Sequence, residues 1–333
     1  YHLTNDIDAS DTATWNEEEG FEPIGTFTGE LDGRGLIIDG LFIDRPSSSN
    51  IALFAAIEGT VKNLGVTNAT VRGFNTNAIM VSIIRSNGRI AQCYVQGSVH
   101  AYRTGNWIAL GGMAVYGRGN SIVEDSYAIV SFSAESGVTT YDPIGGFQLR
   151  VEENAIVRRC YSVSDFSGLP DLGSVPNPHG FLSQYWADGV VANCYWDTET
   201  SGQATSAGGT GKTTAEMQDR DTFTPEWSIR NSNAWDPSAV WVITTGQTYP
   251  MLAWQYVITP SYKPQFSALR IYYDGNYLEE AFDATWRQRL GTGDVLDFDY
   301  PTDADHADDL SEPATVEIRD SEGKRTLQTF RVR

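Results

Sequence analysis

The chain has 333 residues, of which 41% are hydrophobic and 12% aromatic, so it is long and apolar enough to bury a sizeable core. Its formal net charge is −20, from 43 acidic and 23 basic residues. This balance excludes nucleic acid and anionic membranes as partners, because phosphate binding needs clustered Lys and Arg. It suits a soluble surface and favours a saline environment. No apolar run approaches about 18 residues, so we expect no membrane span.

The chain begins with "YHLTNDIDAS", which has the pattern of a strand followed by a turn. Because the first residue is Tyr1 and no signal peptide is visible, we expect a processed or truncated product, with part of the first repeat upstream. From there to residue 200, apolar runs alternate with clusters of Gly, Asn, Ser and Thr, which is typical of short strands and turns.

Six of these apolar runs align as an internal repeat: IIDGLFI, TVKNLGV, RIAQCYV, IVEDSYA, IVRRCYS and VVANCYW. The repeat is imperfect, with 23–34 residues between equivalent positions. Four apolar columns follow from the alignment. The Leu/Cys column holds Leu41, Leu64, Cys93, Ser126, Cys160 and Cys194; the second column holds Val61, Ile90, Val123, Val157 and Val191; the third holds Leu53, Val81, Met113, Phe147 and Phe181; the fourth holds Val71, Val99, Phe132 and Phe166.

Each repeat thus offers two or three short apolar strands that cannot bury their apolar faces alone. Stacked coils can, because each strand pairs with its equivalent in the next coil, about 4.8 Å away. Helical repeats of similar length need apolar positions at i, i+3, i+4 and i+7, which these short Val-, Ile- and Gly-rich runs do not supply. We therefore predict an all-β chain: a right-handed parallel β-helix (solenoid), with a small β-sandwich-like domain after it.

All three cysteines fall in the Leu/Cys column. Cys93 and Cys160 lie two coils apart, beyond disulfide reach, and Cys160 and Cys194 are stacked side chains that point the same way. We interpret all three as small buried hydrophobes. No Cys/His spacing indicates a metal site.

The segments "FTGELDGRGLIIDGLFI" and "LFAAIEGTVKNLGV", the repeated "CY" and the long "CYWDTETSGQATSAGGTGKTTAEMQ…GQTYPMLAWQ" resemble the GLUG-motif repeat proteins over residues 1–255. The resemblance implies a right-handed β-solenoid, a cell-surface or extracellular location, and an adhesive or scaffolding role. It carries no catalytic residues. The repeats here have longer insertions than the short form, at Ser133–Tyr141 and Ser167–Gly180, which we expect to project from one side and to hold the specific function.

Three segments are predicted: a solenoid over 1–200, a segment over 201–255 that caps its open end, and a small β-rich domain over 256–333. The last domain has five strand-like runs and a hairpin turn at "RDSEGKR". Its terminal strand is a candidate subunit contact through edge pairing, which is one route to filaments. The residues of that candidate contact are Thr326, Leu327, Phe330 and Val332.

Two motifs invite other interpretations. "GGTGKTT" at 208–214 has Ser206 where a phosphate-binding loop needs its first glycine, so we interpret it as a turn into a short helical stretch, Thr213–Asp219. The run "DFDYPTDADHADDLSEP" is expected to be a solvated acidic loop, with a calcium site as the alternative and no other cofactor predicted. The candidate calcium ligands are Asp303, Asp305, Asp308 and Asp309.

A tyrosine row follows the Leu/Cys column. It is either a flat platform for sugar rings, a patch covered by a neighbour, or simple aromatic stacking along the solenoid. Its members are Tyr94, Tyr127, Tyr161 and Tyr195.

Catalytic groups do not converge in the sequence. Asp125 and Arg159 share one column with Asn63, Gln92 and Asn193, and we expect this pair to be a surface ion pair. No nucleophile–base pair emerges from the sequence, so we predict a non-enzymatic protein. The four histidines are scattered over different repeat positions: His2, His100, His179 and His306.

Three functions therefore compete. The first is a structural or adhesive extracellular protein, either a surface adhesin segment or a subunit of an appendage. The second is a carbohydrate-binding module, and the third a polysaccharide-degrading enzyme on the solenoid. The expected partners are a copy of the chain itself, or a glycan or protein at the cell surface.

Overall fold

We describe a computed structural model of the chain. It covers residues 1–256, except 107, 141–143, 171–177, 187, 224 and 235, together with the strands found between 270 and 331. The chain divides into two compact units, Tyr1–Gln255 and Tyr256–Arg333. Each is described by itself.

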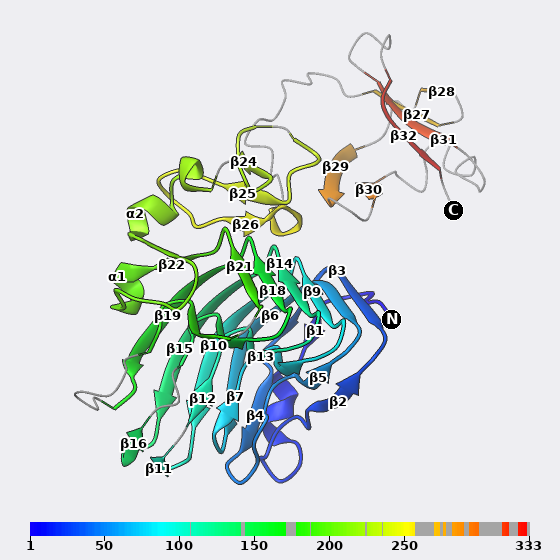
Figure 1. Cartoon of the computed structure of the whole chain (residues 1–333). Helices are drawn as coiled ribbons and strands as arrows, with labels where there is room; N and C mark the ends of the chain where they lie inside the picture. The colour runs from blue at the N-terminus through cyan, green and yellow to red at the C-terminus, as the bar shows by residue number, and fades with distance from the viewer. Residues whose placement is uncertain are drawn as a thin grey trace. The chain divides into compact units, whose positions relative to one another are not determined.

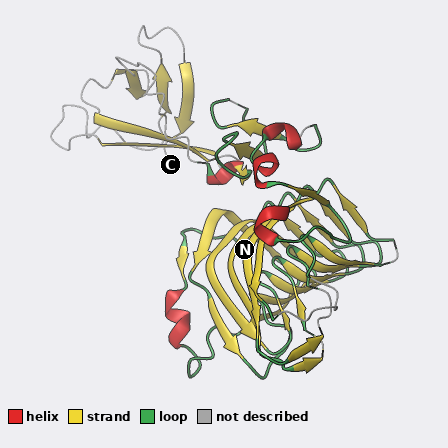
Figure 2. Cartoon of the chain, turned by 90° about the vertical axis from the view of Figure 1, so that its left-hand side faces the viewer, coloured by secondary structure: helices red, strands yellow, loops and turns green. Residues whose placement is uncertain are grey.

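The first unit is a parallel β-solenoid in which a complete coil contributes three strands (Figure 1). Equivalent strands of successive coils pair in parallel and form three stacks, with loops and short helices at the margins (Figure 2). The first stack is β2 (Ile24–Phe27), β5 (Phe54–Ile57), β8 (Val81–Ile84), β13 (Ala114–Gly117), β17 (Gln148–Val151) and β20 (Leu182–Tyr185).

The second and third stacks belong to one sheet, because the long strand β6 (Thr60–Gly73) contributes to both. The preceding coil meets β6 with β3 (Glu30–Asp39) and β4 (Phe42–Arg45), and β1 (Ile7–Asp8) pairs with β3. The second stack continues with β9 (Arg89–Ala91), β14 (Ile122–Glu124), β18 (Ile156–Arg158) and β21 (Val190–Ala192). The third continues with β10 (Tyr94–Ala101), β15 (Tyr127–Ala134), β19 (Tyr161–Gly168), β22 (Tyr195–Asp197) and β23 (Thr210–Lys212).

The strand registers confirm most of the predicted columns. The second column pairs as predicted, as in Val61 with Ile90. In the Leu/Cys column, one member is wrong: Leu64 pairs with Leu36, not with Leu41, because Gly33–Gly35 adds residues to β3 before the column position. In the third column, Val81 aligns with Phe54 and Ala114, so Met80 takes the predicted place of Val81.

The Leu/Cys column is buried, as predicted, and the cysteines are free. Its polar members also hydrogen-bond. The Ser126 hydroxyl donates to the Glu124 carbonyl (2.8 Å), and the thiols of Cys160 and Cys194 lie 3.2 and 3.3 Å from the carbonyls of Arg158 and Ala192. Burial raises the pKa of the Cys93 thiol to about 12. The column therefore serves the backbone at the coil corner as well as the core.

The corner itself is left-handed in each of these coils. One residue before the Leu/Cys column, the backbone has φ between 47° and 52°, a conformation that Asn and Asp tolerate better than β-branched residues. The corner residues are Asn63, Gln92, Asp125, Arg159 and Asn193.

The expected end cap accounts for only part of residues 201–255. The helix α1 (Thr198–Ser201) follows β22, and the chain then crosses the last coil, where Ala207 donates to the Leu182 carbonyl (2.8 Å) and Ser206 Oγ accepts from the Leu182 amide (2.8 Å). Residues 213–255, the flank segment, instead lie along the side of the solenoid. This segment contains α2 (Thr214–Met217), η2 (Arg220–Thr222), β24 (Ile229–Asn231), β25 (Trp241–Ile243), β26 (Met251–Leu252) and η3 (Ala253–Gln255).

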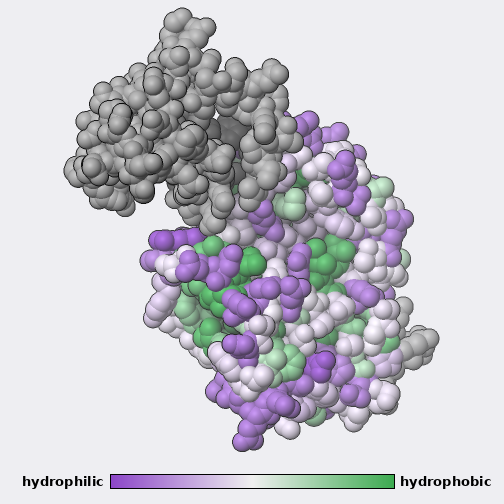
Figure 3. All heavy atoms as spheres, turned by 180° about the vertical axis from the view of Figure 1, so that it is seen from behind, coloured by the Kyte–Doolittle hydropathy of each residue, from purple (hydrophilic) through white to green (hydrophobic). Residues whose placement is uncertain are grey.

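The turn interpretation of "GGTGKTT" is only partly right: Thr210–Lys212 form strand β23, and the predicted short helix follows as α2. Its glycines lead into β23, and Thr213 then caps α2 through a capping box with Glu216. At the other end of the unit, the short helix η1 (Ser10–Thr14) precedes β2. One face of the chain mixes hydrophilic residues with separate apolar patches (Figure 3). Within the described residues, no helix has the length and apolar character needed to span a membrane.

The second unit contains two antiparallel sheets among its described strands. One has the order β28 (Asn276–Tyr277), β27 (Arg270–Tyr273), β31 (Thr315–Arg319) and β32 (Thr326–Arg331). The other pairs β29 (Phe282–Arg289) with β30 (Gly293–Asp299). The antiparallel pairing of β31 with β32 confirms the hairpin predicted at "RDSEGKR".

Candidate functional site

The tyrosine row is stacked, but it is not an exposed platform. The rings of Tyr94, Tyr127 and Tyr161 lie 5.0 and 4.9 Å apart, with interplanar angles of 12° and 7°. Their exposed fractions are only 6%, 2% and 1%. Tyr195 is half-buried against the edge of Phe223. Of the three alternatives, aromatic stacking and cover by a neighbouring segment apply to this row, and an exposed sugar platform does not, because the flank segment covers it.

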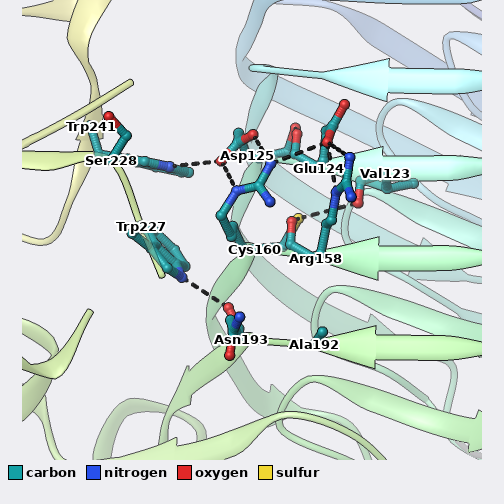
Figure 4. A network of polar contacts seen from close by, with 12 residues as sticks. Val123, Glu124, Asp125, Arg158, Cys160, Ala192, Asn193, Trp227, Ser228 and Trp241 are labelled. Carbon is teal, nitrogen blue, oxygen red and sulfur yellow. Dashed lines mark hydrogen bonds and ion pairs between the residues drawn. The ribbon is translucent and has the colours of Figure 1, made fainter. Parts of the chain in front are cut away.

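Tryptophans of the flank segment attach it to the coil corners. Trp254 donates its indole N–H to the Gln92 carbonyl (3.2 Å), and Trp227 donates to the Asn193 carbonyl (2.9 Å). Between them, Trp241 donates to Asp125 Oδ1 (3.2 Å). Figure 4 shows Trp227 and Trp241 directed at these corner residues.

The tyrosine hydroxyls are also used. Tyr161 donates to the Pro250 carbonyl (2.6 Å), and the Gln255 amide donates to the Tyr127 hydroxyl (2.7 Å). Burial raises the pKa of both tyrosines well above the ordinary value, so both stay neutral donors and acceptors. The tyrosine row thus packs the solenoid against the flank segment, and the hydroxyls of Tyr127 and Tyr161 are hydrogen-bonded across this contact.

A network of charged side chains lies next to the contact between the solenoid and the flank segment (Figure 4). Arg159 grips Asp125 with two bonds of 2.7 and 2.6 Å, and Arg158 and Arg89 both bind Glu124. The Glu124 side chain is 4% exposed. Burial alone would raise its pKa, but the hydrogen bonds from Arg158 and Arg89 outweigh burial, and the pKa is lowered. The predicted Asp125–Arg159 pair exists, but it is partly buried and lies in the contact with the flank segment, where Trp241 donates to Asp125, so it is not a surface ion pair.

A row of polar side chains lies on β4, β6, β10 and β15, at the ends of β10 and β15 that are opposite to the tyrosine row. Strand register aligns Asp44 of β4 with Arg72 of β6, Arg72 with His100 of β10, and His100 with Ser133 of β15. One polar side chain thus stands on each of four successive strands. We name Asp44, Arg72, His100 and Ser133 the polar row.

Neighbouring side chains tie the polar row together. His100 Nδ1 lies 2.9 Å from Ser133 Oγ, and His100 Nε2 lies 3.5 Å from a carboxylate oxygen of Glu135. Tyr102 packs edge-on against the His100 ring, 4.7 Å between centroids, and donates to Asp44 (3.2 Å). The Arg72 guanidinium is 3.5 Å from the same carboxylate.

The polar row remains accessible to solvent. The side chains of Arg72 and Glu135 are each 45% exposed, and those of Asp44 and His100 are 21% and 19% exposed. Burial lowers the pKa of His100, which keeps the ring neutral near pH 7. The row therefore combines donors and acceptors beside the His100–Tyr102 ring pair, with no strong net charge of either sign. Such a surface suits hydroxyl-rich ligands.

The remaining predicted sites lie elsewhere. The acidic run with Asp303, Asp305, Asp308 and Asp309 lies outside the described residues, as does Val332. Within the described residues, no cluster of three or more His, Cys, Asp or Glu side chains is arranged to hold a metal ion. Among the described strands of its sheet, the candidate contact strand β32 pairs with β31 alone, so edge pairing by Thr326, Leu327 and Phe330 stays a prediction.

Comparison with known proteins finds sequence similarity to a surface-protein segment. No family model matches the chain. Over 144 residues the chain is 37% identical to Halomucin from Haloquadratum walsbyi (strain DSM 16790 / HBSQ001). The chain resembles a small part of Halomucin. The matched stretch covers 40% of this chain and 2% of Halomucin's own length. The resemblance to GLUG-motif proteins stays an interpretation of the residues.

Among solved structures, a candidate immunoglobulin A1 protease from Bacteroides ovatus aligns with a TM-score of 0.48 and 18% sequence identity. The alignment covers 77% of this chain and 86% of that chain.

The polar row escaped the sequence analysis, although a signal was present. Arg72, His100 and Ser133 each directly follow a member of the fourth apolar column. Inspecting the position after each column would have brought His100 and Ser133 together, where a search for scattered histidines did not.

Proposed function

We propose that the chain is an adhesive and structural module of an extracellular or cell-surface protein. The similarity to a stretch of Halomucin and the parallel solenoid support this assignment. The acidic balance of 43 to 23 residues supports a soluble module for saline surroundings.

We propose further that the module adheres through the polar row and binds a neutral glycan there. The observation that carries this proposal is the row itself: four polar side chains on successive strands, beside the insertion that begins at Ser133. Carboxylate oxygens accept hydrogen bonds from sugar hydroxyls, whereas Arg72 and Ser133 donate them. A neutral glycan fits best, because the polar row itself carries no strong net charge of either sign.

A glycan array with the full chain tests this proposal. Binding by wild type and its loss in Arg72→Ala and His100→Ala are the expected results. Arg85→Ala is the matched control, since Arg85 is exposed and lies outside the polar row. Equal binding by all four proteins, or no binding by wild type, contradicts the proposal.

One observation favours a second function. Serine, histidine and glutamate stand in the order of an activated nucleophile, with Ser133 on one ring nitrogen of His100 and Glu135 near the other. In that case Ser133 Oγ would attack the carbonyl of an ester on a surface polymer while His100 takes its proton. The ester C–O bond would break, the alcohol would leave with that proton, and water would then hydrolyse the acyl-serine. Our proposal of a non-enzymatic role predicts no labelling of Ser133 by a fluorophosphonate probe. Labelling of wild type that disappears in Ser133→Ala, but not in Ser131→Ala, would favour the hydrolase.

A further inference from the structure

Strand β6 carries the sequence Asn68-Ala69-Thr70 between its covered end and the polar row. It is the one place in the 333 residues where an asparagine is followed two positions later by serine or threonine. This pattern is the acceptor sequence for N-linked glycans in secreted proteins, where the acceptor asparagine lies at the surface. Because a three-residue pattern also arises by chance, the structure around it decides whether a glycan fits there.

Asn68 is the extra residue of a β-bulge. Along β10 the register advances by two residues, from Val95 to Gly97, while along β6 it advances by three, across Asn68. On its other side, β6 pairs with β3 up to Thr67 and with β4 from Thr70 onward. Among the described strands, none has a residue in register with Asn68. A group attached to Asn68 therefore leaves the strand pairing of the sheet in place.

The Asn68 side chain reaches solvent. Its backbone is left-handed, with φ of 51°, and the residue is exposed, whereas its neighbours Thr67 and Ala69 are buried. The side-chain amide donates to Asp39 Oδ1 (2.7 Å), and the Thr67 hydroxyl donates to the same oxygen (2.5 Å). The amide nitrogen carries two hydrogens. One can be replaced by a sugar carbon while the other keeps the bond to Asp39.

The covered part of β6 ends before Asn68. Three residues earlier, Gly65 is buried beneath the ring of Tyr94, which packs against Trp254 of the flank segment. Four residues later, the side chain of Arg72 is 45% exposed. A glycan on Asn68 would thus stand in solvent, about 13 Å along the strand from Arg72.

From this placement we propose that Asn68 is a site of N-linked glycosylation. The donor is, by class, a glycan joined through phosphate to a membrane lipid, and a transferase catalyses the step. Asn68 Nδ2 bonds to the anomeric carbon of the glycan, the bond from that carbon to the phosphate oxygen breaks, and the lipid phosphate leaves. The amide loses one proton to a base of the transferase. The proposal rests on the extracellular location in the proposed function, because this modification belongs to secreted chains.

Trypsin isolates the site, because it cuts after Lys62 and Arg72 and releases residues 63–72 as one peptide. The full chain is recovered from the surface or medium of its own cells, and this peptide is analysed by mass spectrometry. We expect wild type and Thr70→Ser to carry a glycan, which fragmentation locates on Asn68, and Thr70→Val to carry none. Asn63→Gln is the matched control within the same peptide and should keep the glycan, because neither serine nor threonine stands two positions after Asn63.

Melting curves verify that each variant is folded. A wild-type peptide that is unmodified although the chain lies outside the cell, or a glycan that persists in Thr70→Val, would overturn the proposal. A chain confined to the cell interior would overturn the extracellular location and, with it, both proposals. Binding at the polar row is measured separately on the glycan array, so its failure is distinct from failure of this modification.

Discussion

Strands β10 and β15 end in opposite ways. At their first residues, Tyr94 and Tyr127 are buried beneath the flank segment, and their hydrogen-bonding groups are used inside the chain. At their far ends, His100 and Ser133 form part of a polar row that solvent reaches. The difference teaches that an ordered row of side chains on a solenoid is not by itself a binding surface. What decides is whether the rest of the chain covers it.

The largest expected effect follows from opening the sealed end. Trp241→Ala removes the indole that bonds Asp125 and packs against Tyr127 and Tyr161. Because Trp241 is fully buried, we expect a loss of about 3–5 kcal/mol in the free energy of unfolding. Denaturant unfolding measures it. Trp15→Ala, which removes an exposed tryptophan, should change stability by less than about 0.5 kcal/mol. Equal effects of both variants would mean that the flank segment contributes little.

A smaller effect is expected from the charged joint. Glu124→Gln weakens its bonds with Arg158 and Arg89, at a cost of about 2–3 kcal/mol near pH 7. Since the folded-state pKa of Glu124 is below the ordinary value of 4.5, its stabilisation is complete above that pH and is lost as pH falls through the folded-state pKa.

The difference in stability between wild type and Glu124→Gln should therefore shrink below about pH 4.5. Unfolding curves at several pH values measure this. A difference that is constant down to pH 2 would contradict the assigned charge of the buried Glu124 carboxylate.

A third prediction concerns the Leu/Cys column, which lies at the coil corner next to the covered ends of the strands. Ser126→Ala removes the donor to the Glu124 carbonyl and the acceptor of the Cys93 amide, so we expect a loss of about 1–2 kcal/mol. Ser126→Cys restores what neighbouring coils use and should cost less. The order wild type, cysteine, alanine in thermal midpoint is the expected outcome, and the reverse order of the two variants would refute the backbone role.

The smallest effect on stability belongs to the open end. His100→Gln should leave the stability at pH 7.5 within about 0.5 kcal/mol of wild type. Burial lowers the His100 pKa below its ordinary value of 6.5, so the wild type loses some stability as pH falls below 6.5, whereas the variant does not. Melting curves between pH 7.5 and 5 give this comparison; a variant that loses as much as wild type would contradict it.

The repeat made much of the solenoid predictable. The second column and most of the Leu/Cys column follow from residue type and spacing alone. The first coil misled because β3 and β4 both pair with β6, so Leu36 and Leu41 each begin an apolar run that fits the pattern. Two apolar runs against one long partner strand cannot be ordered from hydrophobicity.

The sealed flank could not be predicted from the repeat, because its contacts join segments that share no pattern. Trp254 reaches Gln92, 162 residues away in the sequence. The sequence nevertheless contained a signal, because the chain has two aromatic-rich segments: the tyrosine row and the tryptophans after residue 220. Each can bury the other, and in the structure they form one apolar cluster. In the same way, the fixed offset of His100 and Ser133 from the fourth column was visible, but their mutual contact required the register.

The unequal repeat lengths have a consequence for how such a chain can change. The connection from the third stack to the first lengthens from residues 74–80 after β6 to residues 102–113 after β10, yet β8 and β13 still pair in register. The added residues leave the strand pairing of the solenoid unaltered, and they follow directly after the strands that carry the polar row. Insertions there can therefore diversify, or be engineered as grafts for new recognition loops, without repacking the core.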